Sequence, residues 1–425
     1  MASKPEAVQP VWGAVPSAFS LLRLWPRAAS TKDDHQRELG LLAESGLNVV
    51  TSPELQQNST GPVAELLDVD IDDAGNYIHT LAIRQPAKPA AESPESPPRH
   101  SLVLTHGYFT GIGFYFRNYH ELSQVPNWDV YSIDWLGMGR SSRPAYHSRR
   151  GDGEDARVAH AESFFVESLE EWRQRLGIER MTLCGHSFGG YMSALYALKY
   201  PERVEKLVLV SPIGIPEAPP DFDEKLRQGY GPARRRGRAS PPSERTPEYE
   251  AAEAAEAAEP ASKSGGPSRT QIMWFRLAMN LWERNFTPQW VVRSAGPFSR
   301  RLIDMYVGRF TWLSELQRSA LAAYAHQISV LPGSSESALG DILRPGAFAR
   351  RPLVNRLHAL AVPTVFMYGA NDWVDFTGGE QVIRRITANV DTRLFRIPRA
   401  GHNLHLENAA DFNRVLVGEM RAISD

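Results

Sequence analysis

The chain has 425 residues, enough for one large α/β domain with an insertion or for two smaller domains. Its formal net charge of −2 gives no reason to expect a nucleic-acid partner, and its one cysteine, Cys184, excludes an internal disulfide framework. Apolar residues make up 42% of the chain, but no apolar run reaches the roughly 18 residues that span a bilayer. Any membrane contact is therefore expected to be peripheral.

The N-terminal segment, residues 1–30, has Glu6 as its only acidic side chain and carries Lys4, Arg23 and Arg27 around an apolar, serine-containing stretch. It resembles a mitochondrial transit peptide more than a secretory signal, because Arg23 interrupts the apolar part. A terminus without a targeting role, or an aromatic anchor on a membrane surface, is the alternative interpretation. We treat residues 1–60 as an N-terminal extension that includes a helix at 33–45.

The next part of the chain, residues 61–212, predicts a mostly parallel sheet. Two segments with alternating apolar residues are joined by a Gly-containing turn at 72–75, which indicates a hairpin. Short continuous apolar runs follow, typical of strands buried on both faces, and a helix is expected at 164–176. Strands that alternate with helices favour right-handed crossovers within one sheet. The predicted strands are 64–71, 76–83, 101–105, 128–133, 181–184 and 204–210.

The segment 183–191 fits the pattern Gly-x-Ser-x-Gly between an apolar run and a helix-like repeat. It predicts a nucleophile elbow, a sharp strand-to-helix turn with Ser187 at its tip. Gly185 and Gly189 are needed there because a side chain at either position would collide with the neighbouring backbone. A Gly/Ser loop between two core elements is the alternative. Cys184, in the apolar run, is interpreted as a buried packing residue.

Two further polar residues follow predicted strands. Asp372 comes after the strand at 362–368, and His402 after the strand at 392–397, so both share a sheet edge with Ser187. A serine hydroxyl is a weak nucleophile until a histidine accepts its proton and an acid orients that histidine. We therefore predict the triad Ser187, His402 and Asp372.

Three other residues compete for these roles. Asp375 is the rival acid, but it lies further from the strand end than Asp372. His186, inside the elbow, and His405, beyond the histidine loop, are interpreted as polar loop residues rather than as the base. A terminal helix at 406–423 is expected to complete the core.

The loop after the strand at 101–105 begins His106-Gly107-Tyr108. Small residues here allow the backbone amide of Tyr108 to face the elbow and form an oxyanion hole with the amide of Phe188. Gly137 and Gly139 lack the spacing of a dinucleotide fingerprint. We expect neither a cofactor nor a metal.

Residues 213–350 interrupt the alternation of strands and helices and predict a helical cap inserted after the sixth predicted strand. Within it, residues 230–269 are rich in Pro, Ser, Ala, Glu and Arg and cannot bury enough apolar surface to fold alone. The core resumes at 351–425. Aromatic and arginine residues interleave over 271–310, which suits contact with anionic lipid, although internal pairing is the alternative. The predicted lipid contacts are Trp274, Arg276, Trp282, Arg284, Trp290 and Arg293.

At these residues the chain resembles the α/β-hydrolase superfamily, and more narrowly its subfamily of lipid-acting α/β-hydrolase-domain proteins. That subfamily includes N-acyl-phospholipid lysophospholipases, a lipase coactivator and mitochondrial cardiolipin-specific deacylases. The resemblance extends from about residue 100 onward, outside the low-complexity insert. It is carried by the segments 185–193, 200–212 and 369–373 and by the cap pairs Gly296-Pro297 and Arg309-Phe310.

The resemblance implies an α/β-hydrolase fold and a serine hydrolase that cleaves phospholipid acyl esters, with cardiolipin as the preferred substrate and the mitochondrial inner membrane as its location. A lysophospholipid acyltransferase is one alternative, but members proposed to transfer acyl groups carry His-x4-Asp where this chain has His402 and Glu407. A non-catalytic coactivator is the other, and Ser187 argues against it. Protein partners cannot be inferred, and cytoplasm or lipid droplet are alternative locations.

Overall fold

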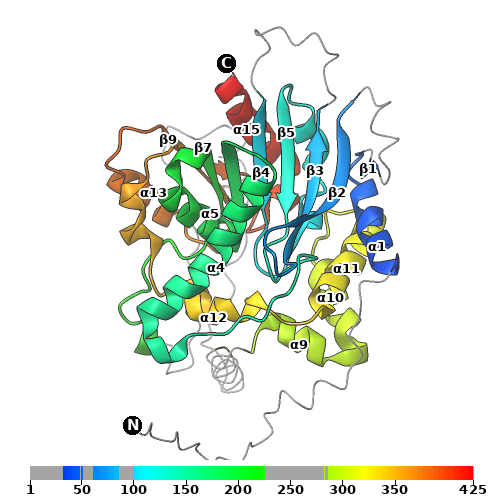
Figure 1. The fold of residues 1–425 in the computed structure, drawn as a ribbon, viewed down its shortest axis with the longest axis horizontal. Helices are drawn as coiled ribbons and strands as arrows, with labels where there is room; N and C mark the ends of the chain where they lie inside the picture. The colour runs from blue at the N-terminus through cyan, green and yellow to red at the C-terminus, as the bar shows by residue number, and fades with distance from the viewer. Residues whose placement is uncertain are drawn as a thin grey trace, which may run out of the picture.

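The computed structural model describes residues 32–47, 49–50, 61–85, 99–224, 282 and 286–424. Within them, nine strands form one sheet in the order β1-β2-β3-β5-β4-β6-β7-β8-β9 (Figure 1). Neighbours from β5 through β9 are parallel, and β3 is antiparallel to both β2 and β5. The expected mostly parallel α/β sheet is confirmed. The strands are β1 Val49–Val50, β2 Val63–Asp70, β3 Tyr77–Arg84, β4 His100–Thr105, β5 Trp128–Ile133, β6 Met181–His186, β7 Val204–Val210, β8 Thr364–Gly369 and β9 Thr392–Ile397.

The predicted hairpin is present as β2 and β3, whose register pairs Asp70 with Tyr77. Its turn is held by Asp72, whose Oδ1 accepts the amides of Ala74 at 3.0 Å and Asn76 at 2.9 Å. Asp and Asn bond in this way to backbone a few residues ahead, which explains why this segment turns instead of extending.

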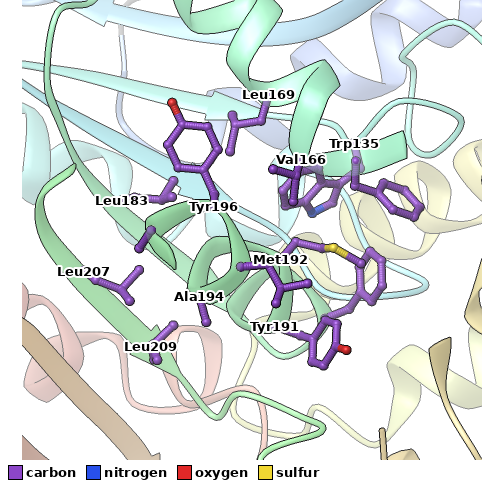
Figure 2. Packing of buried hydrophobic residues seen from close by; sticks show 14 of the residues in the cluster. Trp135, Val166, Leu169, Leu183, Tyr191, Met192, Ala194, Tyr196, Leu207 and Leu209 are labelled. Carbon is purple, nitrogen blue, oxygen red and sulfur yellow. The ribbon is translucent and has the colours of Figure 1, made fainter. Parts of the chain in front are cut away.

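The central strands are buried on both faces, so successive side chains enter two different layers of core. In β6 and β7, Leu183 and Leu207 join one apolar cluster, whereas Cys184 and Val208 join the other. Cys184 is a buried free cysteine, as expected. Figure 2 shows the first cluster, in which residues of α4 and α5 pack over β6 and β7.

Helices cover both faces of the sheet. In Figure 1, α4 and α5 lie over the face nearer the viewer. On the opposite face, Leu416 and Met420 of α15 belong to the second cluster. The expected helix at 164–176 is the second half of α4, which begins ten residues earlier at Glu154, where Glu154 and Asp155 favour a helix start. The core helices are α1 Lys32–Ala43, α3 Tyr119–Ser123, α4 Glu154–Arg175, α5 Phe188–Lys199, α13 Thr377–Arg385, α14 Leu404–Glu407 and α15 Ala409–Ser424.

Between β7 and β8 the chain forms a separate helical layer, below the sheet in Figure 1. Its helices are α9 Pro288–Ser294, α10 Ser299–Gly308, α11 Glu315–Val330 and α12 Ala338–Ile342. Ile303, Val307 and Ile328 of this layer form a third apolar cluster with Leu41 of α1. No helix in the described part of the chain is both long and apolar enough to cross a membrane.

Candidate active site

Ser187 lies on the turn between β6 and α5, with φ at 55°, a left-handed backbone angle that is uncommon for serine. The turn is held because the Ser187 amide donates to the carbonyl of Val210 at 2.8 Å. A Cβ on Gly185 would lie 2.4 Å from the carbonyl oxygen of Gly189, and one on Gly189 would lie 2.6 Å from that of Thr105. Both glycines are therefore required by this strained turn.

The structure brings Ser187, His402 and Asp372 together in hydrogen-bonding order. Nε2 of His402 lies 3.0 Å from Oγ of Ser187, and Nδ1 lies 3.1 Å from Oδ1 of Asp372. A carboxylate only accepts hydrogen bonds, so Nδ1 carries the proton and Nε2 is left to accept the serine hydroxyl. This tautomer is the one that allows His402 to remove the serine proton.

Asp372 is held from its other side as well. The hydroxyl of Ser211, just past β7, donates to Oδ2, and the amide of Val374 donates to Oδ1 at 3.0 Å. The Asp372 side chain is only 2% exposed, whereas that of His402 is 16% exposed. Oriented donors and burial fix the carboxylate against the imidazole. Sequence reasoning missed Ser211, although its position at the end of a parallel strand was a usable signal.

Asp375, the rival acid, is placed elsewhere. Its Oδ1 accepts the amide of Thr377 at 3.0 Å, at the start of α13. The carboxylate that reaches His402 is that of Asp372.

The two other histidines near the triad are buried, and they lie at the end of β6 (His186) and in α14 (His405), not in loops as predicted. Nε2 of His186 lies 2.8 Å from the carbonyl oxygen of His402 and must donate to it, so this nitrogen cannot accept the Ser187 proton. Burial lowers the pKa of His186 well below its usual range, and burial followed by the neighbouring His402 lowers the pKa of His405 to about 3. Both rings are therefore neutral near neutral pH, and His186 supports the His402 loop.

Of the two predicted oxyanion donors, Phe188 directly follows Ser187, and Tyr108 follows a residue that lies close to it. Phe188 is the first residue of α5, where a helix leaves amides without an intrahelical acceptor. Tyr108 follows Gly107, whose added Cβ would lie 3.0 Å from Cβ of Ser187. The loop backbone thus approaches the serine closely enough to place an amide beside it, and only a residue without a side chain fits at Gly107.

Glu407 is a site residue that sequence analysis considered only as a departure from a motif. Its Oε2 accepts the amide of Gly401 at 2.5 Å, and its Oε1 accepts the amide of Asn403 at 3.1 Å. These two amides flank His402. One carboxylate therefore clamps both sides of the loop that carries the histidine, a role that only the three-dimensional structure shows.

The predicted lipid contacts differ in what surrounds them. Arg293 forms an ion pair with buried Glu336, and its Nη1 also donates to the carbonyl of Leu331, which is the internal pairing left open by the sequence. Trp282 packs against the main core and donates from Nε1 to the carbonyl of Leu343 at 3.3 Å. Trp290 is half-buried against Phe286. Trp274, Arg276 and Arg284 lie outside the described residues.

Comparisons with known proteins agree with this fold. A sequence model of the family described as alpha/beta hydrolase fold matches residues 100–409. A 1-acylglycerol-3-phosphate O-acyltransferase of Arabidopsis thaliana is 32% identical over 325 residues, covering 75% of this chain but just under two thirds, 65%, of that protein. A (lyso)-N-acylphosphatidylethanolamine lipase of Mus musculus is 30% identical over 329 residues, covering 76% of this chain and 80% of that protein. A solved bromoperoxidase of Bacillus anthracis, 18% identical, covers 84% of this chain and 99% of its own with a TM-score of 0.51, which speaks to the fold alone.

Proposed function

The chain belongs to the α/β-hydrolase family, in a subfamily that acts on lipids, and we propose that it is a serine hydrolase that cleaves fatty-acyl esters of phospholipids. The observation that carries the proposal is the continuous arrangement of Asp372, His402 and Ser187, with the serine on a strained elbow. Strained backbone conformations are concentrated at active sites, so a serine at φ 55° beside a histidine that can accept its proton favours a catalytic role.

In the first half of the reaction, Oγ of Ser187 attacks the ester carbonyl while His402 accepts the serine proton. The amides of Tyr108 and Phe188 stabilise the oxyanion, an arrangement worth about 3 kcal/mol per donor in comparable enzymes. The ester C–O bond then breaks, and His402 protonates the departing lysophospholipid oxygen. The acyl group remains on Ser187.

In the second half, water gives a proton to His402 and attacks the acyl carbon. The bond to Ser187 then breaks, His402 returns the proton to Oγ of Ser187, and the fatty acid leaves. Asp372 keeps the imidazole oriented and offsets its positive charge in both halves. The reaction needs no group other than these side chains, the two amides and water.

The substrate class is supported by the relatives, which are named a lipase of an N-acylated phospholipid and acyltransferases for a lysophospholipid. Within this class we propose cardiolipin as the substrate and a peripheral location on an anionic mitochondrial membrane. The support for this choice is the resemblance and the basic, acid-poor segment 1–30. The test is lipid analysis of mitochondria with and without the protein, and an unchanged cardiolipin acyl profile contradicts the choice of cardiolipin.

Acyl transfer is the second candidate function, because 1-acylglycerol-3-phosphate O-acyltransferases are among the relatives, including one of Homo sapiens that is 30% identical over 317 residues, 74% of this chain and 75% of that protein. In that reaction a lysophospholipid hydroxyl, and not water, attacks the acyl-enzyme on Ser187. Supplying labelled phospholipid with and without lysophosphatidic acid separates the two. Labelled phosphatidic acid as the main product favours transfer, and labelled free fatty acid favours hydrolysis.

The nucleophile is tested with a fluorophosphonate probe, which should label the wild-type protein and fail to label Ser187→Ala. Release of fatty acid from phospholipid in mixed micelles should fall by several orders of magnitude in the same variant, as it does when triad members are removed. An unchanged melting temperature controls for folding. Labelling and turnover that survive in Ser187→Ala would overturn the proposal, and a wild type without either would favour a non-catalytic lipid-surface adaptor.

A further inference from the structure

The large apolar side chains that are exposed to solvent are concentrated in one segment. Among the described residues six large apolar side chains are exposed, and five of them lie between positions 291 and 316. Single exposed apolar residues are ordinary, but a cluster marks a surface that meets something else. The five, with their exposed fractions, are Val291 47%, Phe298 69%, Met305 66%, Trp312 42% and Leu316 65%.

Helix α10 accounts for the centre of this cluster. Its inward side carries Ser299, Ile303 and Val307, which are buried, and the last two pack in the third apolar cluster against α11. Phe298 and Met305 are seven residues apart, about two helical turns, so they share the outward side. The outward side thus carries large apolar side chains among charged ones, and nothing in the described structure covers them.

The same surface is basic. Residues 294–318 contain four arginines and two acidic residues, a formal charge of +2. Arg300 pairs with Asp304 at 2.8 Å, and Arg309 stacks over Tyr306, but exposed Arg301 has no ion-pair partner among the described residues. Arg301 lies three residues after Phe298 and four before Met305, so its charge stands between the two apolar side chains.

This surface adjoins the candidate active site. Tyr306 of α10 packs edge-on against Phe109 at 5.6 Å between ring centroids, and Phe109 directly follows Tyr108, the predicted oxyanion donor. The sixth exposed apolar residue, Trp373, lies 4.7 Å from the ring of His402. Exposed apolar surface therefore occurs on the cap beside the oxyanion loop and also beside the catalytic histidine.

We infer that the outward side of α10, formed by Phe298, Arg301 and Met305 and extended by Trp312, is the surface on which the protein rests on an anionic phospholipid bilayer. Apolar side chains would enter the acyl boundary while arginines meet phosphate groups. A second copy of the chain fits less well, because a symmetric contact would bring the same positive charges together. The inference rests on the proposed function, since a bilayer is where a phospholipid substrate is found.

The surface lies within the segment 271–310 that the sequence associated with anionic lipid, but two of the contacts named there are engaged elsewhere. Arg293 is engaged with Glu336 and Trp282 with the core, so neither contributes to it. What distinguishes Phe298 and Met305 is exposure, which composition does not reveal.

The experiment measures co-sedimentation of the full chain with phosphatidylcholine vesicles that contain increasing fractions of phosphatidylglycerol. A Ser187→Ala background keeps the vesicles intact. Binding should rise with the anionic fraction and fall with salt. The double variant Phe298→Ser/Met305→Ser should lose roughly tenfold or more in affinity, and Arg301→Gln about fivefold. Arg384→Gln, which removes an exposed arginine on α13, is the matched control and should bind as the parent does.

In proteins that retain Ser187, the variants should hydrolyse phospholipid in detergent micelles and a short soluble ester at wild-type rates, and they should lose activity only on vesicles. Vesicle binding that is unaffected by these substitutions overturns the inference, even if hydrolysis is intact. A dimer that dissociates in the double variant, with vesicle binding unchanged, overturns it in favour of a second copy. By contrast, a wild type that binds vesicles but cleaves no phospholipid in micelles overturns the proposed function and leaves the docking surface standing.

Discussion

Glu407 occupies the position at which a His-x4-Asp motif would place its acid, and it bonds to the amides of Gly401 and Asn403 on either side of His402. We predict that Glu407→Ala lowers kcat for a soluble ester roughly a hundredfold with little change in KM, because small displacements of a catalytic group have effects of that size. Steady-state kinetics provide the measurement. The role belongs to the histidine loop, so it serves hydrolysis and transfer equally.

The control for this prediction is Asp411→Asn, which removes a nearby carboxylate that binds Arg414, Asn408 and Arg399 but neither of the amides beside His402. Its kinetics should match those of the wild type. Glu407→Asp, which keeps the charge but shortens the side chain, should recover part of the lost kcat without changing the ratio of transfer to hydrolysis. If Glu407→Asp converts the protein into a transferase, the residue selects the acceptor and the positioning role is wrong.

The buried ring of His405 predicts how the free energy of unfolding depends on pH. Its pKa of about 3 in the folded protein lies below the value of about 6.5 in an unfolded chain. Below pH 6.5 this histidine binds a proton in the unfolded chain but stays unprotonated in the folded chain. The free energy of unfolding therefore falls, as the pH is lowered, by up to about 1.4 kcal/mol per pH unit for this group. Urea unfolding between pH 7 and 5 measures the slope, which His405→Phe should reduce and His358→Asn, at an exposed position, should preserve. Equal slopes in all three proteins contradict the assignment.

Elements buried on both sides could be predicted from the sequence, because a short, continuous apolar run between turn residues is typical of a buried strand. For this reason β5 and β7 begin and end where the pattern placed them. Strand β1, with two residues, is too short to carry a period. The first ten residues of α4 were not predicted as helix. Only Val158, Ala161 and Glu162 among them are buried, so the sequence shows no apolar repeat at helical spacing there.

The candidate site likewise contains residues that could be predicted from the sequence and contacts that could not. Ser187, Asp372 and His402 follow strand ends and could be named from the sequence. The contact of Ser211 with Asp372 joins segments 161 residues apart, and that of Arg293 with Glu336 joins residues 43 apart, so neither follows from a local pattern. The contacts of Glu407 are local, six and four residues back, but they depend on the path of the loop between β9 and α14. Patterns along the chain report which side chains are apolar or catalytic in type. They do not report which exposed surface is left uncovered, as α10 illustrates.

The described part of the chain folds around one sheet, and a long insertion separates β7 from β8. This arrangement predicts how the protein tolerates deletion. Residues 231–267 contain Tyr249 as their only large apolar or aromatic side chain, so removing them forfeits little burial. Loop closure contributes only about 0.6 kcal/mol per doubling of length, so a shorter connection changes stability slightly. We predict that the deletion variant melts within a few degrees of the full chain and retains turnover of a soluble ester.

A deletion through α10 and α11, which contribute Ile303, Val307 and Ile328 to an apolar cluster, should instead lower the melting temperature strongly. A large fall in melting temperature on removing 231–267 would mean that this segment packs against the core, contrary to its composition.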